Sequence, residues 1–281
     1  MVAAARRSTR SPTSRRPVHL PPGLGFTPSS AKPTPRTKAA GSSPLVPVRT
    51  PSALRGGTFP CLAYVVVYHA CAVGGLLLLH AREHGGVVSP THLALSVFCA
   101  INAWICVCEI ALFVHYDAVQ RQYAEFTASL GEGVLPPVFL FERVRLAELF
   151  TLRYWAVMWS TYATLDPSYA DTTTFGFCVD VGNGFTTLVP TVVFAIGMSG
   201  RLLSARALGM LGLLKFYQEL YGTCVYFFQY CFNRRFDRST RAHVWGVVVP
   251  ANAIWIALPV LGMWASKRLI VEGNFAVFGG A

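Results

Sequence analysis

Apolar residues fall in blocks that are long enough to cross a bilayer. The blocks run over about 59–80, 93–114, 174–198, 207–230 and 244–265. A membrane-spanning helix needs roughly 20 mostly apolar residues, and each block meets this length. The pattern therefore predicts an all-α polytopic membrane protein, built as a five-helix transmembrane bundle.

The segment between the second and third blocks is more mixed. Residues 116–150 carry several charges, and Pro136-Pro137 interrupts any helix there. Residues 149–165 are rich in Trp, Tyr and Phe. A sixth span is one interpretation of this stretch, but aromatic residues at such density are also typical of the bilayer interface. We expect an interfacial helix or a helix that caps a cavity.

Charge divides the chain at about residue 58. Residues 1–58 hold ten Lys and Arg residues and no acid, whereas the rest holds 14 basic and 13 acidic residues. The formal net charge of +11 therefore belongs to the N-terminal segment and not to a folded basic face, which argues against nucleic-acid binding. We expect a disordered basic tail over 1–58 or, equally, an organellar targeting peptide. A transmembrane domain over 59–270 and a C-terminal tail over 271–281 follow.

Cysteine and histidine give no sign of a disulfide framework or a metal site. Cys106 and Cys108 point to different faces of a helix, and no C-x-x-C pair occurs. We expect the cysteines to be small packing residues. His69 and His115 are expected to form local hydrogen bonds, and no cofactor is predicted. The eight cysteines are Cys61, Cys71, Cys99, Cys106, Cys108, Cys178, Cys224 and Cys231. The histidines beyond the tail are His69, His80, His84, His92, His115 and His243.

Four apolar blocks each carry an acid or amide that is costly in a bilayer. Glu109, Asp180, Glu219 and Asn252 come from four different blocks, and a charge at the bilayer centre costs about 2.5–3.5 kcal/mol. They would line one polar pocket if all faced inward, or each would hydrogen-bond a neighbouring helix. Trp255 shares a helix face with Asn252. Its indole would stabilise a cation or anchor helix packing.

Several motifs then show a family resemblance. Residues 159–169 read WSTYATLDPSY, Cys178-Val179-Asp180 follows, 219–223 read ELYGT and 252–259 read NAIWIALP. These resemble, in order and spacing, the W-x-x-Y-A-x-x-D-x-x-Y, Cys-x-Glu, Q-I-Y-G-D and N-A-L-W-L-V-L-P segments of the emopamil-binding protein family. This family includes sterol Δ8–Δ7 isomerases and belongs to the wider EXPERA group. The likeness covers about residues 60–270.

The resemblance implies a five-span fold and an enzyme that shifts a double bond in a sterol or related polycyclic terpenoid. The reaction protonates the alkene and removes a proton from a neighbouring carbon, in a buried polar pocket. Glu109 and Asp180 match the catalytic acids, and Trp255 matches the indole that stabilises the cation. The substrate-binding residues expected from it are Tyr169, Asn183, Glu219, Tyr221, Asn252 and Trp255.

The sequence departs from the family pattern around the proton path. Ile105 stands where the family has a His four residues before the acid at 109, and Thr223 stands where it has an Asp. Asp180 is one methylene shorter than the family's Glu, and a shift of about 1 Å can lower a rate on the order of 100-fold. Catalysis is therefore left open. The alternative is a non-catalytic EXPERA-type protein that binds a sterol or amphiphilic amine, or acts as a chaperone.

The expected partners are the membrane and a sterol or sterol-like lipid, with a homodimer as an open alternative. More basic residues lie on the N-terminal side of the predicted spans, which places the N-terminus in the cytosol. The family resemblance implies the endoplasmic reticulum, and the tail leaves a plastid or mitochondrial membrane as the alternative.

Overall fold

The computed structural model describes residues 57–279, so the expected tail lies outside the described residues apart from 57 and 58. Four helical stretches in this range are long and apolar enough to cross a membrane, namely Cys61–His84, Pro90–Val114, Phe175–Gly200 and Arg241–Glu272. The chain is thus an all-α, membrane-embedded protein.

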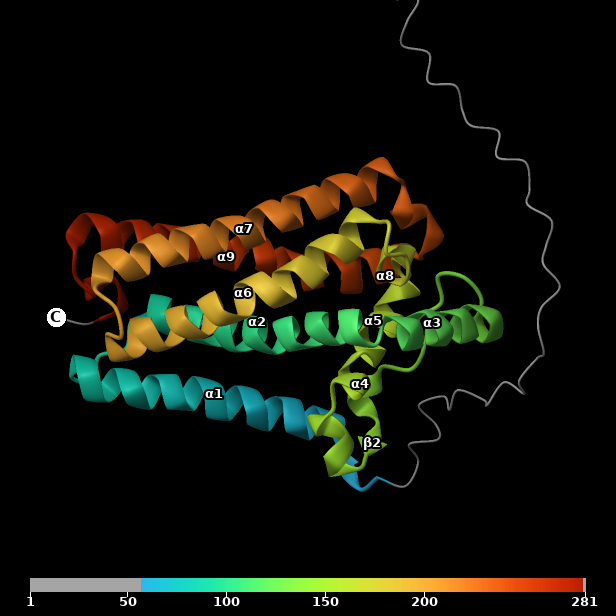
Figure 1. Cartoon of the computed structure of the whole chain (residues 1–281), viewed down its shortest axis with the longest axis horizontal. Coiled ribbons are helices and arrows are strands. Elements are labelled where there is room, and N and C mark those ends of the chain that lie inside the picture. The colour runs from blue at the N-terminus through green and yellow to red at the C-terminus, as the bar shows by residue number, and fades with distance from the viewer. Residues whose placement is uncertain (1–56, 280–281) are drawn as a thin grey trace, which may run out of the picture. The chain divides into compact units, whose positions relative to one another are not determined.

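Long helices dominate the described range (Figure 1). They are α1 (Cys61–His84), α2 (Pro90–Val114), α6 (Phe175–Gly200), α7 (Ala205–Phe232) and α9 (Val249–Glu272). The last span in the list above joins α9 to α8 (Arg241–His243) through a π-helical turn, η6 (Val244–Val248). The helix α7 has 28 residues and is the longest of these helices, and it carries Lys215 and Glu219 inside its apolar sequence.

Side-chain caps mark the starts of α2 and α6. The Ser89 hydroxyl accepts a hydrogen bond from the His92 backbone N–H at 3.1 Å, and Pro90 occupies the first helical position of α2. A proline suits this position because the N–H that it lacks would have no partner within the helix. Thr174 caps α6 in the same manner. The sequence therefore encodes these helix starts locally.

Small residues let the long helices approach closely. The helix α9 lies along α7, and α6 lies along α2 (Figure 1). At Gly184 on α6, an added Cβ would come within 2.8 Å of the Glu109 Cβ on α2. At Gly262 on α9, it would come within 2.5 Å of the Phe216 ring on α7. Such glycines are typical of helix contacts in membranes, where close backbone packing drives association.

Short elements connect α2 to α6 at one end of the bundle. A sixth span over 149–165 does not form, because α4 has 4 residues and α5 has 7. At about 1.5 Å per residue neither helix can cross a bilayer. The short elements before α6 are α3 (Tyr116–Leu130), η2 (Phe139–Phe141), η3 (Leu146–Phe150), α4 (Leu152–Trp155), α5 (Val157–Ala163) and η4 (Pro167–Ala170). A short antiparallel pair joins β1 (Phe59–Pro60) to β2 (Arg143–Val144). The remaining short elements are η5 (Arg235–Arg238) and η7 (Ala276–Phe278).

The segment expected as a C-terminal tail over 271–281 is described as far as residue 279 and packs against α2. Helix α9 continues to Glu272, and the described residues after it dock on the start of α2. The Ser89 hydroxyl donates a hydrogen bond to the Val277 carbonyl at 3.0 Å, and Phe278 is fully buried. Apolar side chains at 275, 277 and 278 explain the docking, because their burial removes apolar surface from water.

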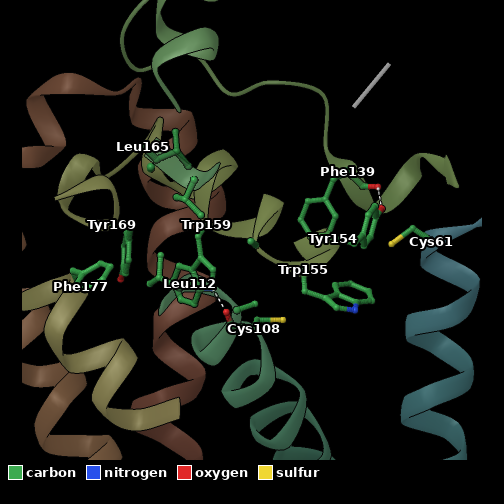
Figure 2. Close-up of a cluster of buried hydrophobic side chains, with 14 of the residues drawn as sticks. Cys61, Cys108, Leu112, Phe139, Tyr154, Trp155, Trp159, Leu165, Tyr169 and Phe177 are labelled. Carbon is green, nitrogen blue, oxygen red and sulfur yellow. Dashed lines mark hydrogen bonds between the residues drawn. The ribbon is translucent and has the colours of Figure 1, made fainter. Parts of the chain in front are cut away.

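Two clusters of buried side chains form at opposite ends of the long helices. The aromatic cluster gathers the start of α1, the end of α2 and the short elements, whereas the packed cluster gathers the start of α2 and the end of α9. The aromatic cluster includes Cys61, Cys108, Leu112, Phe139, Tyr154, Trp155, Trp159, Leu165, Tyr169 and Phe177 (Figure 2). The packed cluster includes Leu95, Phe98, Phe194, Met198, Leu208, Phe216, Leu269 and Phe278.

Candidate functional site

A cavity of about 300 Å³ opens between α2, α6, α7 and α9, with α5 covering it at the aromatic end. This volume is within the range of small-molecule sites, and its wall is mostly apolar with a few polar groups. Seven of the eight site residues expected from the sequence line it. These residues are Glu109, Asp180, Tyr169, Asn183, Glu219, Asn252 and Trp255.

Tyr221, the eighth of the expected residues, does not line the cavity. Its side chain is 56% exposed, and it stacks on Tyr217 on the outer face of α7. Residues two positions apart on a helix point to nearly opposite faces. Because Glu219 faces the cavity, Tyr221 must face outward.

Glu109 is held at the cavity wall by contacts of its own backbone. The Trp159 indole N–H donates a hydrogen bond to the carbonyl oxygen of Cys108, the preceding residue, at 2.6 Å (Figure 2). On the other side, Gly184 lets α6 approach the Glu109 Cβ. The side chain is 6% exposed, and its Oε2 has no hydrogen-bond partner among the described residues. Glu109 therefore offers the cavity a carboxyl oxygen that no neighbouring side chain occupies.

Asp180 and Tyr169 form a second polar point on the wall. Asp180 lies near the start of α6, and the Tyr169 side chain interacts with it electrostatically. The Tyr169 ring lies 4.9 Å from the Trp159 ring and 5.3 Å from the Tyr162 ring, measured between centroids. Burial raises the pKa of Tyr169 well above its usual range. The phenol therefore stays protonated at neutral pH and can donate a hydrogen bond.

Asn252 and Trp255 complete the wall on the α9 side. The Asn252 amide donates to the Tyr162 hydroxyl at 2.9 Å and to the Val248 carbonyl at 2.8 Å. Trp255 packs edge to face on Phe98 with 5.1 Å between ring centroids, and it also lines the cavity. Both residues take part in helix packing and line the cavity, so the packing interpretation holds and the role of the indole toward a cation stays a prediction.

Two polar residues of the α7 region were missed from the sequence. The Lys215 ammonium lies 2.7 Å from Glu219 Oε1, and both side chains are almost fully buried. Asn102 on α2 lines the cavity and donates to the same oxygen. The spacing of Lys215 and Glu219, four residues apart within one apolar block, was the signal available.

An ion pair that was also not predicted from the sequence lies at the aromatic end. The fully buried carboxylate of Asp166 accepts a hydrogen bond from Arg235 at 2.6 Å and another from the Ser168 backbone N–H at 3.1 Å. The contact joins η5 to the turn between α5 and η4. Arg235 is 69 residues away in sequence, and no local pattern pairs it with Asp166.

No imidazole lines the cavity, and Ile105 is part of its wall. The His69 ring nitrogen Nδ1 hydrogen-bonds the Val65 carbonyl at 2.7 Å, which confirms its local role. His115 is the residue at which α2 ends, and its local hydrogen-bonding role stays a prediction. Neither ring replaces the family imidazole.

Three histidines instead gather at the packed end of the bundle. The His80 ring centroid lies 4.5 Å from that of His84 and 4.0 Å from that of His92. His92 hydrogen-bonds Ser199 at 2.9 Å. Within residues 57–279, no group of His, Cys, Asp and Glu side chains is arranged to hold a metal ion. The His80 and His84 rings are stacked, whereas the His80 and His92 rings are tilted by 38°.

All eight cysteines are free thiols. Four are buried and four are exposed on the outer surface, so packing accounts for only half of them. Cys106 hydrogen-bonds the Asn102 side-chain oxygen at 3.3 Å, whereas Cys108 packs in the aromatic cluster. The two thiols therefore do face different neighbours.

The cavity thus has an apolar wall, aromatic faces and carboxyl groups from three helices. Such a site can bind a lipid-like molecule and stabilise positive charge on it, because π faces and carboxylates both attract cations. No protein-family model matches the chain, and no curated protein matches it significantly.

Proposed function

We propose that the chain is an EXPERA-type membrane protein, similar to the emopamil-binding protein family, that binds a sterol or sterol-like polycyclic lipid and shifts one of its double bonds. One observation carries the proposal. Glu109, Asp180, Asn252 and Trp255, from three helices that are distant in sequence, meet in a single cavity of about 300 Å³. The motif resemblance supplies the ligand class, and the cavity supplies a suitable place for it.

The five-span topology belongs to this proposal. The helix α7 lies beside α6 and α9 (Figure 1), and at 28 residues it is long enough to cross a bilayer. Its charged residues Lys215 and Glu219 neutralise each other within the bundle. An ion pair lowers the cost of placing these charges in a membrane, so α7 serves as the fifth span.

The proposed reaction needs one carboxyl as acid and one as base. One of Glu109 and Asp180 protonates an alkene carbon, which leaves a cation on the neighbouring carbon. The other carboxylate removes a proton from the carbon next to the cation, and the electron pair of that C–H bond forms the new double bond. The substrate gains one proton and loses one. The faces of Trp255, Trp159 and Tyr169 stabilise the cation between the two steps.

Expression in yeast that lacks its own sterol Δ8–Δ7 isomerase tests the proposal. We expect Δ7 sterols to appear in the sterol profile of cells that carry the wild-type chain. Glu109→Gln should lower product formation by about 100-fold or more, because a positioned acid or base contributes at least that factor. Glu132→Gln, which changes an exposed acid, is the matched control and should leave the profile unchanged.

A second candidate function is sterol or amphiphilic-amine binding without turnover. Ile105 at the cavity wall favours it, because the family has an imidazole at this position. The Ile105→His variant separates the two functions. If only this variant forms Δ7 sterols, the chain is a binding protein on an isomerase scaffold. If neither form makes product while both are present in the membrane, the isomerase proposal is wrong.

The compartment is part of the same proposal. The family resemblance favours the endoplasmic reticulum. The N-terminal segment 1–58, which contains ten basic residues and no acid, favours a plastid or mitochondrion. A fluorescent protein fused to the C-terminus of the full chain would show which of these membranes carries it.

A further inference from the structure

The buried ion pair on α7 does not serve helix association in the usual way. Lys215 and Glu219 lie on the same helix, four residues apart, and their side chains are 0% and 3% exposed. The ion pair itself lies within one helix, and the contact with a second helix is made by Asn102 on α2, which donates to Glu219. Apolar residues of similar size often replace buried ion pairs with no loss of stability. The charges therefore call for a role beyond packing.

The surroundings of Lys215 keep it away from the cavity. Its ammonium lies 4.3 Å from the centre of the Phe216 ring and 5.2 Å from that of Phe98. Lys215 is not among the cavity-lining residues, whereas Glu219 is. Glu219 therefore stands between the lysine and the cavity, and Lys215 can act on a ligand only through Glu219.

Two donors converge on one oxygen of Glu219. Lys215 donates to Oε1 at 2.7 Å, and the Asn102 amide donates to the same oxygen. Asn102 is itself fixed by a second hydrogen bond, to the Thr191 hydroxyl at 3.0 Å. The other oxygen, Oε2, is buried and has no partner among the described residues. The donors thus hold the carboxylate of this cavity-lining residue in one orientation, and the hydrogen-bonding capacity of Oε2 stays unused.

We propose that Glu219 Oε2 is a subsite that accepts a hydrogen bond from a hydroxyl group of the ligand, with Lys215 as its positioning residue. The inference rests on the proposed function, which supplies an apolar polycyclic ligand. The charge of Glu219 is already balanced by Lys215, so the pair suits a neutral donor better than a second cation. A hydrogen bond to a carboxylate is stronger than one between neutral groups.

This subsite gives the ligand a direction in the cavity. Within residues 57–279, neither Glu109 nor Asp180 forms an ion pair with Lys, Arg or His. Positive charge that develops on the ligand is therefore stabilised near α2 and α6, while the hydroxyl group binds at α7. The two polar points of the wall thus recognise different groups of one molecule.

A pair of matched probes tests the subsite on the purified full chain. Binding of radiolabelled cholesterol is compared with binding of its 3-O-methyl ether, which cannot donate a hydrogen bond. We expect the wild type to bind cholesterol about tenfold more tightly or better, as for one lost hydrogen bond to a charged acceptor. The double variant K215M/E219L should bind both probes with the affinity that the wild type has for the ether. Retained ether binding shows that the double variant is folded.

Two further variants separate a positioning role from a structural one. K215M should lower the ratio of cholesterol to ether affinity, and K215R should restore much of it. R268M/E272L removes the Arg268–Glu272 pair, which has the same four-residue spacing on α9 but is exposed to 43% and 27%. This matched control should leave the ratio unchanged.

The outcomes distinguish the inference from the proposed function. Equal binding of the two probes by the wild type, or an unchanged preference in K215M/E219L, overturns the hydroxyl subsite and leaves sterol binding standing. Failure of the wild type to bind either probe overturns sterol binding itself, and the subsite with it.

Discussion

The two ends of the helix bundle differ in how the space between the helices is filled. At the packed end, the Phe216 ring lies against Gly262, and the Phe194 ring lies against Gly212. At the aromatic end, short helices place Trp159 and Tyr169 over the long helices, and a cavity of about 300 Å³ remains beneath them. Large rings are abundant at both ends, so the presence of aromatic residues alone does not decide which end is hollow.

The difference lies in what faces each ring. A glycine opposite a ring lets two helices close on it, and the packed interior then has no space for a ligand. At the aromatic end the rings belong to α5 and η4, which are too short to follow a long helix along its length. Their burial is local, and the gap between α2, α6 and α9 stays open. Polar groups such as Glu109 and Asp180 can therefore occupy the gap.

Truncation of Phe216 should produce the largest effect. Its ring is fully buried between Gly262, Phe194 and Phe98. We expect Phe216→Ala to lower the free energy of unfolding by about 3–5 kcal/mol, as for large-to-small changes in a filled core. Leu214→Ala, at a residue 72% exposed on the same helix, is the control. A similar loss for both variants in thermal unfolding in detergent would show that the packed end is not tightly filled.

The ion pair at the aromatic end should be the next most sensitive point. Arg235→Met leaves the fully buried Asp166 carboxylate without its cation. Loss of one partner of a buried pair costs roughly 3–5 kcal/mol, and because Arg235 is 13% exposed we expect about 2 kcal/mol. Arg234→Met removes an arginine whose side chain is 75% exposed and should have little effect. If the two variants unfold at the same temperature, the pair does not hold this end of the bundle together.

Adding one methyl group at the cavity wall should have a smaller effect than the two changes above. Gly184→Ala would place the new Cβ 2.8 Å from the Glu109 Cβ. A Cβ is bonded directly to the backbone, so neither atom can move away by side-chain rotation. We expect a loss of about 1–2 kcal/mol in stability, typical of overpacking, and weaker sterol binding or turnover. Gly182→Ala is a close match on the same helix, because nothing lies within 4 Å of its added Cβ. Equal behaviour of the two variants would contradict the close approach of α2 and α6.

The smallest effect should come from the exposed turn before α6. The Thr173 side chain and backbone N–H both donate to Asp171, at 2.7 and 2.9 Å, and these hydrogen bonds lower the pKa of the Asp171 carboxyl below its usual value of 3.8. A lowered folded-state pKa gives stability that is present above the ordinary value and is lost as pH falls through the lowered one. Thermal stability should therefore fall slightly below about pH 4. Asp171→Asn should flatten this step, and Thr173→Val should move the step to higher pH; an unchanged pH profile in both would count against the turn.

Helix positions followed well from the sequence because hydrophobicity and capping act locally. The blocks at 93–114 and 174–198 correspond closely to α2 and α6, and Pro90 occupies the first position of α2. The stretch at 149–165 had two interpretations, and the structure decides between them with two short helices beside the cavity. The docking of the residues after α9 did not follow from the sequence, because it depends on α2, which is far away in sequence.

The candidate site was only partly accessible to the same reasoning. Glu109, Asp180, Glu219 and Asn252 stood out because a polar group in an apolar block is costly wherever it lies. Tyr221 lies outside the cavity, because motif likeness does not say which way a helix is rotated. A charged Lys215 in an apolar block is as costly as Glu219. Its role, however, depends on which oxygen of Glu219 it contacts, and the sequence does not give that contact.

The sequence by itself determined that this is a helical membrane protein with acids inside its apolar blocks, since bilayer thickness and the cost of burying charge act on each segment separately. Only the tertiary structure decided that those acids share one cavity, that Asp166 pairs with Arg235, and that Glu219 keeps one oxygen free. These are contacts between segments, and they depend on helix rotation and close packing at glycines such as Gly184, which no local pattern encodes.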